Sequence, residues 1–204
     1  MSLQIALARM AELQQMFAPQ AVAQPTATST ATFASTMQAT PAASAMTPLT
    51  AASPAGTPAG QAILNAIRPE VGVAEQPPGS NDGPRIAEYR ATTAGSGVGP
   101  WCAYFTSWAA AQAGVPLGEA GQGFGSVSAL YGWAQRTGRA TPAGPGVHPN
   151  PGDLIVWGGE HIGIVESVDP DGSIHTIEGN SSNAVSRRTY GPDGGGATGY
   201  VHLG

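Results

Sequence analysis

The 204-residue sequence contains no lysine, and all eight of its basic residues are arginine. Only 10% of the residues are charged, and the formal net charge is −5. A protein that follows a phosphate backbone normally carries a stripe of basic residues. Because this sequence shows no such stripe, we do not expect a nucleic acid partner.

Cysteine is almost absent as well, since Cys102 is the only one. A single cysteine excludes an internal disulfide and any metal site built from several cysteines. Taken alone, it is more often a buried small apolar residue than a reactive thiol. The four histidines are dispersed and lack the His-x-x-x-His spacing of zinc hydrolases, so we predict no metal site.

Long apolar runs are missing, which excludes a transmembrane span in this sequence. The first residues, MSLQIALARMAELQQMF, place Arg9 and Glu12 where a signal peptide needs an uninterrupted apolar core. We therefore expect no recognisable cleavable signal peptide.

Three regions differ in composition. Residues 1–16 have apolar side chains at helical spacing and predict one amphipathic helix, either a frayed terminal helix or a targeting or partner-binding element. Residues 17–60 predict a disordered linker, because Ala, Thr, Ser, Pro and Gly make up 33 of the 40 residues in 21–60. Residues 61–204 show the pattern of a globular domain.

The globular region begins with helical patterns and ends with strand patterns. Helices are expected at 61–67, 84–92, 101–114 and 126–137, and strands at 153–157, 162–168, 173–178, 185–190 and 198–203. This order predicts an α+β fold in which the N-terminal helices pack on an antiparallel β-sheet.

One predicted hairpin can be assigned a register. Residues 169–172, Asp-Pro-Asp-Gly, are a strong turn signal between two strand patterns. If these four residues form the loop, Val168 faces Ser173, and the numbers of facing residues sum to 341.

This register brings three polar side chains together. His161 faces Asn180, and Gly163 faces Glu178, so His161, Glu178 and Asn180 project from one side of the sheet. Gly163 leaves room beside the carboxylate. A one-residue bulge would place His161 and the other two on opposite faces.

Cys102 completes a candidate catalytic set. It stands in the first turn of its predicted helix, where free N–H groups and the helix dipole favour a thiolate and an oxyanion. Considered singly, each residue has a non-catalytic interpretation. Cys102 could pack in the core, and His161 could be an exposed strand end. Glu178 could be solvated, and Asn180 could belong to a turn. Their conjunction instead favours a nucleophile, a base and groups that orient the base.

Four segments around these residues resemble the CHAP domain, the cysteine, histidine-dependent amidohydrolase/peptidase branch of the NlpC/P60 superfamily. They are Gly-Pro-Trp-Cys-Ala-Tyr-Phe-Thr-Ser-Trp at 99–108, Pro-Gly-Asp-Leu-Ile-Val-Trp at 151–157, His-Ile-Gly-Ile-Val-Glu at 161–166 and Ile-Glu-Gly-Asn-Ser at 177–181. The resemblance covers roughly residues 66–204, with the motifs in the order of the family.

The resemblance implies a papain-like fold and hydrolysis of amide bonds in bacterial peptidoglycan without an obligatory cofactor. Position by position, Cys102 matches the nucleophile, His161 the base, Glu178 the orienting acid and Asn180 the accompanying amide. Ser96 stands six residues before the cysteine, where papain has the glutamine that donates to the oxyanion. The second oxyanion donor is therefore unassigned.

Some CHAP enzymes carry a calcium loop near the nucleophile. Glu75, Asn81 and Asp82 offer oxygen ligands, but they do not form a spaced acidic loop. We instead predict a turn that caps the following helix.

The sequence leaves the cleaved bond open between an endopeptidase and an N-acetylmuramoyl-L-alanine amidase. Alternatives are an inactive cell-wall-binding or scaffold protein of an export or flagellar apparatus, and a phage lysin. The unprocessed amphipathic start and the linker resemble flagellar-type export substrates. We therefore expect an exported protein, at the cell wall or outside the cell, whose N-terminal helix contacts the export or flagellar machinery.

Overall fold

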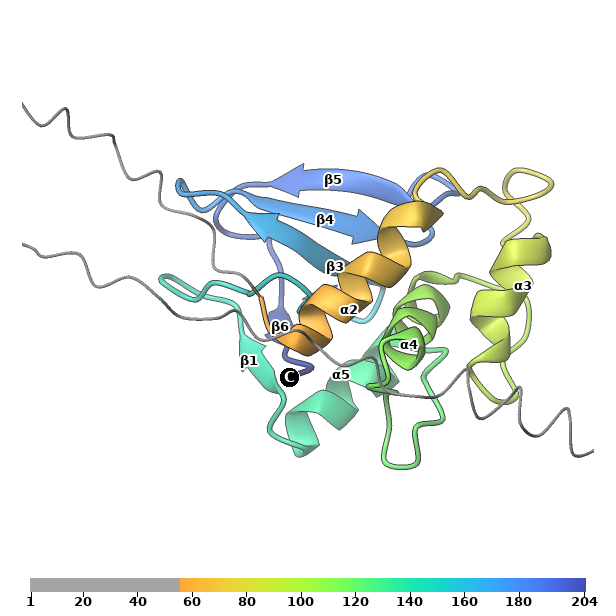
Figure 1. Ribbon diagram of the computed structural model, residues 1–204, viewed down its shortest axis with the longest axis horizontal. Helices are drawn as coiled ribbons and strands as arrows, with labels where there is room; N and C mark the ends of the chain where they lie inside the picture. Colours follow the sequence, from red (N-terminus) through yellow and green to blue (C-terminus); the bar gives the residue numbers. More distant parts are fainter. Residues whose placement is uncertain (1–55) are drawn as a thin grey trace, which may run out of the picture. The chain divides into compact units, whose positions relative to one another are not determined.

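A computed structural model describes residues 56–204 of the chain (Figure 1). The predicted helix at 1–16 and the predicted linker up to residue 55 lie outside these described residues. The linker prediction was wrong at its C-terminal end, because residues 58–60 already belong to a helix.

The helices of the described region lie close to the predicted segments. They are α2 (Pro58–Ile67), the short 3₁₀ helix η1 (Arg68–Glu70), α3 (Pro84–Ala91), α4 (Cys102–Gln112) and α5 (Val127–Arg136). Helix α2 starts three residues earlier than expected because Thr57 Oγ1 accepts a hydrogen bond from Gly60 N at 3.0 Å, and Pro58 suits the first helical position. Between residues 56 and 204, no helix is long and apolar enough to cross a membrane.

Six strands form one sheet in the order β1-β6-β2-β3-β4-β5, and every pairing is antiparallel. They are β1 (Ala140–Pro142), β2 (Leu154–Trp157), β3 (His161–Val168), β4 (Ile174–Glu178), β5 (Ser186–Tyr190) and β6 (Gly199–Val201). Five were expected, and β1 is additional. The predicted α+β class is therefore confirmed.

Helix α4 is the centre of the helical layer. Its residues from Cys102 to Ala110 are all buried, and it contacts α2, α3, α5 and β3. Figure 1 shows it among the other helices beside the sheet. Burial on every side explains why this helix is rich in alanine and aromatic residues and lacks a polar face.

The sheet is apolar on both faces. Six of its side chains join the core formed with the helices: Leu154, Val156, Ile162, Ile164, Ile177 and Val201. Residues that point to the other face form a second cluster: Ile155, Val165, Val168, Ile174 and Tyr200. The strands thus bury alternate residues on opposite faces, as the period of two requires.

One close approach sets the distance between the sheet and α4. A Cβ atom placed on Gly179, directly after β4, would lie 2.5 Å from Cβ of Phe105 on α4. Real side-chain atoms do not approach so closely, so only glycine allows the end of β4 to reach the helix that begins at Cys102.

Candidate active site

Cys102 is the first residue of α4, as predicted. Trp101 precedes the helix without capping it through its side chain, and the first turn closes with a 3.0 Å bond from Phe105 N to Trp101 O. The N–H groups of residues 102–104, which come before Phe105, have no partner within the helix. They and the helix dipole favour negative charge at the thiol and at an oxyanion beside it.

A buried carboxylate anchors the start of this helix. Glu75 is only 2% exposed, and its Oε1 accepts a 2.9 Å hydrogen bond from the indole Nε1 of Trp101. Its Oε2 accepts a second one from Asn81 N at 3.0 Å. Both oxygens are therefore engaged in holding the loop at 75–81 against the residue that precedes Cys102.

The neighbouring acidic residue is also engaged. Asp82 Oδ1 accepts hydrogen bonds from both terminal nitrogens of Arg90 at 3.1 Å. Within the part of the chain that the structure describes, no group of three or more His, Cys, Asp and Glu residues is arranged to hold a metal ion. The segment before α3 ends at Gly83, which is the N-cap of the helix and makes no side-chain cap hydrogen bond.

His161 and Glu178 form the central contact of the site. His161 Nε2 lies 2.8 Å from Glu178 Oε2. The Glu178 side chain is 1% exposed, whereas that of His161 is 29% exposed. An ionised carboxylate can only accept hydrogen bonds, so Nε2 carries the proton and the second ring nitrogen, Nδ1, is left for other partners.

The second oxygen of Glu178 is held by two hydroxyl groups. Thr176 donates to Oε1 at 2.6 Å, and Tyr190 donates to the same oxygen at 2.9 Å. Burial alone would raise the pKa of Glu178, but the hydrogen bonds from His161, Thr176 and Tyr190 lower it below its ordinary value. The carboxylate therefore remains charged at neutral pH although it is buried.

The pKa of His161 moves in the opposite direction. Burial lowers it, but hydrogen bonds to Cys102 and Glu178, together with the charges of both partners, raise the pKa to about 9. A protonated imidazole next to a sulfur atom favours the thiolate form of cysteine.

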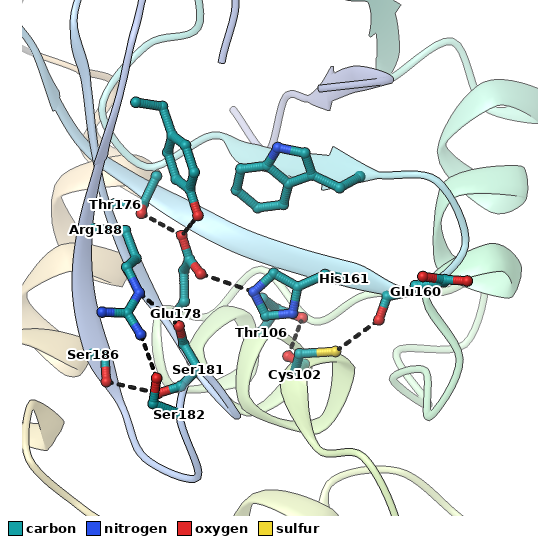
Figure 2. Close-up of polar contacts among 12 residues, drawn as sticks. Cys102, Thr106, Glu160, His161, Thr176, Glu178, Ser181, Ser182, Ser186 and Arg188 are labelled. Carbon is teal, nitrogen blue, oxygen red and sulfur yellow. Dashed lines mark hydrogen bonds and ion pairs between the residues drawn. The ribbon is translucent and has the colours of Figure 1, made fainter. Parts of the chain in front are cut away.

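The Cys102 sulfur lies near the Glu160 carbonyl, in the turn before β3, and near the His161 ring at the start of β3. Sγ is 3.8 Å from the carbonyl oxygen of Glu160, and hydrogen bonding with the Cys102 side chain helps to raise the pKa of His161. Figure 2 shows the His161 ring between the Glu178 carboxylate and the Cys102 side chain. Sulfur, imidazole and carboxylate thus form one continuous set.

An aromatic ring supports the imidazole. Trp157 is paired with His161 across β2 and β3, and the two rings stack with centroids 5.5 Å apart. The Trp157 ring also packs on Tyr190 at 4.9 Å, and its Nε1 donates to Gly194 O at 2.8 Å. This contact restricts rotation of the imidazole away from Glu178.

The register of the hairpin differs from the prediction at its turn. Val168 pairs with Ile174 rather than Ser173, so the loop has one residue more than expected. If this register continued along β3 to its start, His161 and Glu178 would lie on opposite faces of the sheet. A bulge between Val165 and Ser167 restores the predicted register.

Beyond the bulge the pairing follows the predicted sum of 341. Ile164 pairs with Ile177. A Cβ on Gly163 would lie 2.7 Å from Cγ of Glu178, so Gly163 borders the carboxylate as expected. The longer loop and the bulge shift the register by one residue each, and the two shifts cancel at the site.

Asn180 lies outside this hydrogen-bonded set. It sits in the turn after β4 with φ of 58°, in the left-handed region that asparagine tolerates better than most residues. Among the described residues, its side chain makes no hydrogen bond to His161. The structure therefore brings Cys102, His161 and Glu178 together, while the role of Asn180 stays a prediction.

Three residues that touch the set were not predicted from the sequence: Thr176, Tyr190 and Trp157. Thr176 lies two residues before Glu178 on the same strand face, which was a usable signal. Tyr190 and Trp157 reach the site through the pairings of β4 with β5 and of β2 with β3.

The remaining histidines lie outside this set. His175 Nε2 is 2.8 Å from Asp169 Oδ2, and its strand position has the opposite parity to Glu178. His202 Nδ1 is 2.8 Å from Asp153 Oδ2. His148 is exposed in the loop between β1 and β2.

Helices packed on an antiparallel sheet, with a thiol at a helix start beside an imidazole on a strand, define a papain-like α+β fold. Residues 93–180 match the family model of the CHAP domain, the family that the sequence motifs resemble. CHAP domains are typically cysteine- and histidine-dependent amidohydrolases, in a family of peptidoglycan-hydrolase type. No curated protein matches the chain.

Proposed function

We propose that this protein hydrolyses an amide bond in peptidoglycan, in a stem peptide or a crossbridge, with Cys102 as the nucleophile. The observation that carries the proposal is the continuous contact from Cys102 through His161 to Glu178. A buried thiol used only for packing would not need a buried carboxylate to orient the imidazole beside it.

The proposed reaction begins with a proton on His161 and a thiolate on Cys102. The sulfur attacks the amide carbonyl carbon, and the N–H groups at the start of α4 stabilise the resulting oxyanion. His161 then donates its proton to the leaving amine as the C–N bond breaks. A water molecule then gives a proton to His161 and attacks the thioester, and breaking of the C–S bond releases the new carboxyl group and restores the Cys102 thiolate beside a protonated His161.

Glu178 keeps its charge throughout this sequence. It holds the ring through Nε2 and stabilises the positive imidazolium, which is the task of the orienting acid in such triads. Asn180 is proposed to assist only if substrate binding changes the turn in which it lies. A second oxyanion donor is not assigned.

The test is incubation of purified sacculi with the full chain, followed by mass spectrometry of the released fragments. The new termini distinguish an endopeptidase from an N-acetylmuramoyl-L-alanine amidase. We expect Cys102→Ala to release no fragments while melting at a temperature close to that of the wild type. Full activity of Cys102→Ala would refute the proposal.

An inactive scaffold is the competing function. Labelling with iodoacetamide near neutral pH separates the two, because a thiolate paired with His161 reacts and a packed thiol does not. The small exposed fraction of Cys102, 3%, is what favours the scaffold, so reactivity is the decisive measurement. Sacculus binding with neither labelling nor fragment release would support it.

We also propose that the protein acts outside the cytoplasm, where its substrate lies, and that residues 1–20 direct its export. Deleting these residues should leave hydrolysis of sacculi intact and abolish export. Unaffected export of the shortened chain would remove this part of the proposal.

A further inference from the structure

The arginines of the described region differ in their partners. Five of them form ion pairs with carboxylates: Arg68, Arg85, Arg90, Arg136 and Arg187. Arg139 lies over the ring of Trp133. Arg188 is hydrogen-bonded only to neutral groups between residues 56 and 204, which leaves its positive charge without a protein counterion.

The guanidinium of Arg188 is nevertheless held in place. Its Nε donates to Ser181 Oγ at 3.0 Å, and its Nη2 donates to Ser182 Oγ at 2.7 Å. Ser186 fixes the same turn by donating its hydroxyl to Ser181 O at 2.8 Å. No acceptor within the described residues binds Nη1. The group is thus oriented and keeps donor capacity for a ligand.

Arg188 belongs to the same face of the sheet as the catalytic carboxylate. It pairs with Thr176, while Glu178 pairs with Ser186, and directly paired residues share one face. Figure 2 shows Arg188 reaching from β5 toward the two serines, next to Glu178. The unneutralised cation therefore borders the proposed active site.

The next residue along β5 provides a contrast. Arg187 projects to the opposite face, where its Nε and Nη2 donate to both oxygens of Glu166 at 2.7 and 3.1 Å. Two adjacent arginines thus differ in one respect that matters for binding: one is neutralised by the protein and the other is not.

We propose that Arg188 binds a free carboxylate of the peptide substrate and thereby selects acidic stem peptides. This inference rests on the proposed function. Peptidoglycan stems carry free carboxylates on side branches and at their C-terminus, and these can be present as carboxamides instead. The planar guanidinium suits a carboxylate in geometry and charge, whereas a carboxamide provides only a neutral acceptor.

The test measures binding by calorimetry in the Cys102→Ala background, which prevents turnover. The probes are two pairs of synthetic muramyl tetrapeptides. One pair differs in a carboxylate or carboxamide at the second residue, and the other pair differs in the same way at the C-terminus. We expect the carboxylate form of one pair to bind roughly 10- to 100-fold more tightly, the range expected for a charge-assisted hydrogen bond.

Arg188→Gln should abolish this preference, because the carboxylate form loses its charge-assisted contact and therefore weakens more than the carboxamide form. Arg187→Gln is the matched control and should retain the preference. The pair that responds identifies which carboxylate Arg188 binds. If Arg188→Gln does not fold, Arg188→Lys replaces it, with a smaller but measurable loss expected because lysine cannot form the same planar contacts.

Equal binding of carboxylate and carboxamide in both pairs would overturn the inference, as would an equal loss of affinity for all four probes in Arg188→Gln. No binding of any probe would overturn it too. If the wild type fails to cleave sacculi but the Arg188-dependent preference persists, the binding site stands and the proposed reaction fails.

Discussion

Tyr190 donates its hydroxyl to Glu178 Oε1 across 2.9 Å, on the carboxylate oxygen that His161 does not use. The acid is therefore oriented from both sides, by the imidazole on one oxygen and by a strand-borne phenol on the other. In the proposed site, Cys102 and His161 would react with the substrate, whereas Tyr190 would only hold Glu178 in place and need not touch the substrate.

Tyr190→Phe should reduce kcat/KM about 5- to 30-fold, because removing one hydrogen bond from a buried charged group typically costs about 1–2 kcal/mol. The tyrosine lowers the pKa of Glu178, so its loss should also move the acid limb of the pH–rate profile to higher pH. The measurement is kcat/KM between pH 4 and pH 9.

Tyr200→Phe is the control for this substitution. Tyr200 is buried in the second core cluster, and its hydroxyl makes no hydrogen bond within the described region. In this control, kcat/KM and the pH at which its acid limb falls should both be unchanged. An unmoved acid limb in Tyr190→Phe would mean that the hydroxyl only packs.

The imidazole of His161 should titrate near pH 9 in a histidine NMR titration, compared with an ordinary value of 6.5. Cys102→Ala should lower this pKa, because the hydrogen bond and charge of Cys102 help to raise it. The His161 contribution to the free energy of unfolding should be fully present below pH 6.5 and be lost as the pH rises through 9. A His161 pKa at or below 6.5 in the wild type would contradict the ion pair.

Gly163→Ala should impair catalysis, because the added Cβ would lie 2.7 Å from Glu178 Cγ and displace the carboxylate from His161. A displacement on the order of 1 Å can cost about 100-fold in rate. The measurement is kcat/KM with the melting temperature. Gly144→Ala is the matched control, since nothing lies within 4 Å of its Cβ position. Equal activity of the two variants would refute this role of Gly163.

The helices and most strands could be predicted because each depends on local signals. The start of α4 at Cys102 follows from the glycine- and proline-rich approach and the helix-forming residues after it. The α5 N-cap, Ser126, accepts a hydrogen bond from Ala129 N at 3.3 Å and was equally visible in the sequence.

The contact between His161 and Glu178 could be predicted only through two errors that cancel. Composition signalled the turn at 169–172, but the loop takes in Ser173 as well, with Asp169 N bonded to Ser173 O at 2.9 Å. Nothing local in the sequence indicates the compensating bulge near Glu166. That residue is held by Arg68 and Arg187, both distant in sequence.

The supporting residues escaped prediction for a related reason. Tyr190 reaches Glu178 only if β5 pairs with β4 in one particular register, and Trp157 stacks on His161 only if the turn at 158–160 returns the chain directly. Pairings of this kind are decided by packing across the whole sheet, which a single sequence does not display.

The bulge in β3 separates the outer turn of this hairpin from the chemistry at its other end. The turn at 169–173 closes the hairpin at the end opposite to His161 and Glu178. That turn is consequently a suitable place to insert a fluorophore site or an affinity tag, giving a reporter that lies away from the proposed active site.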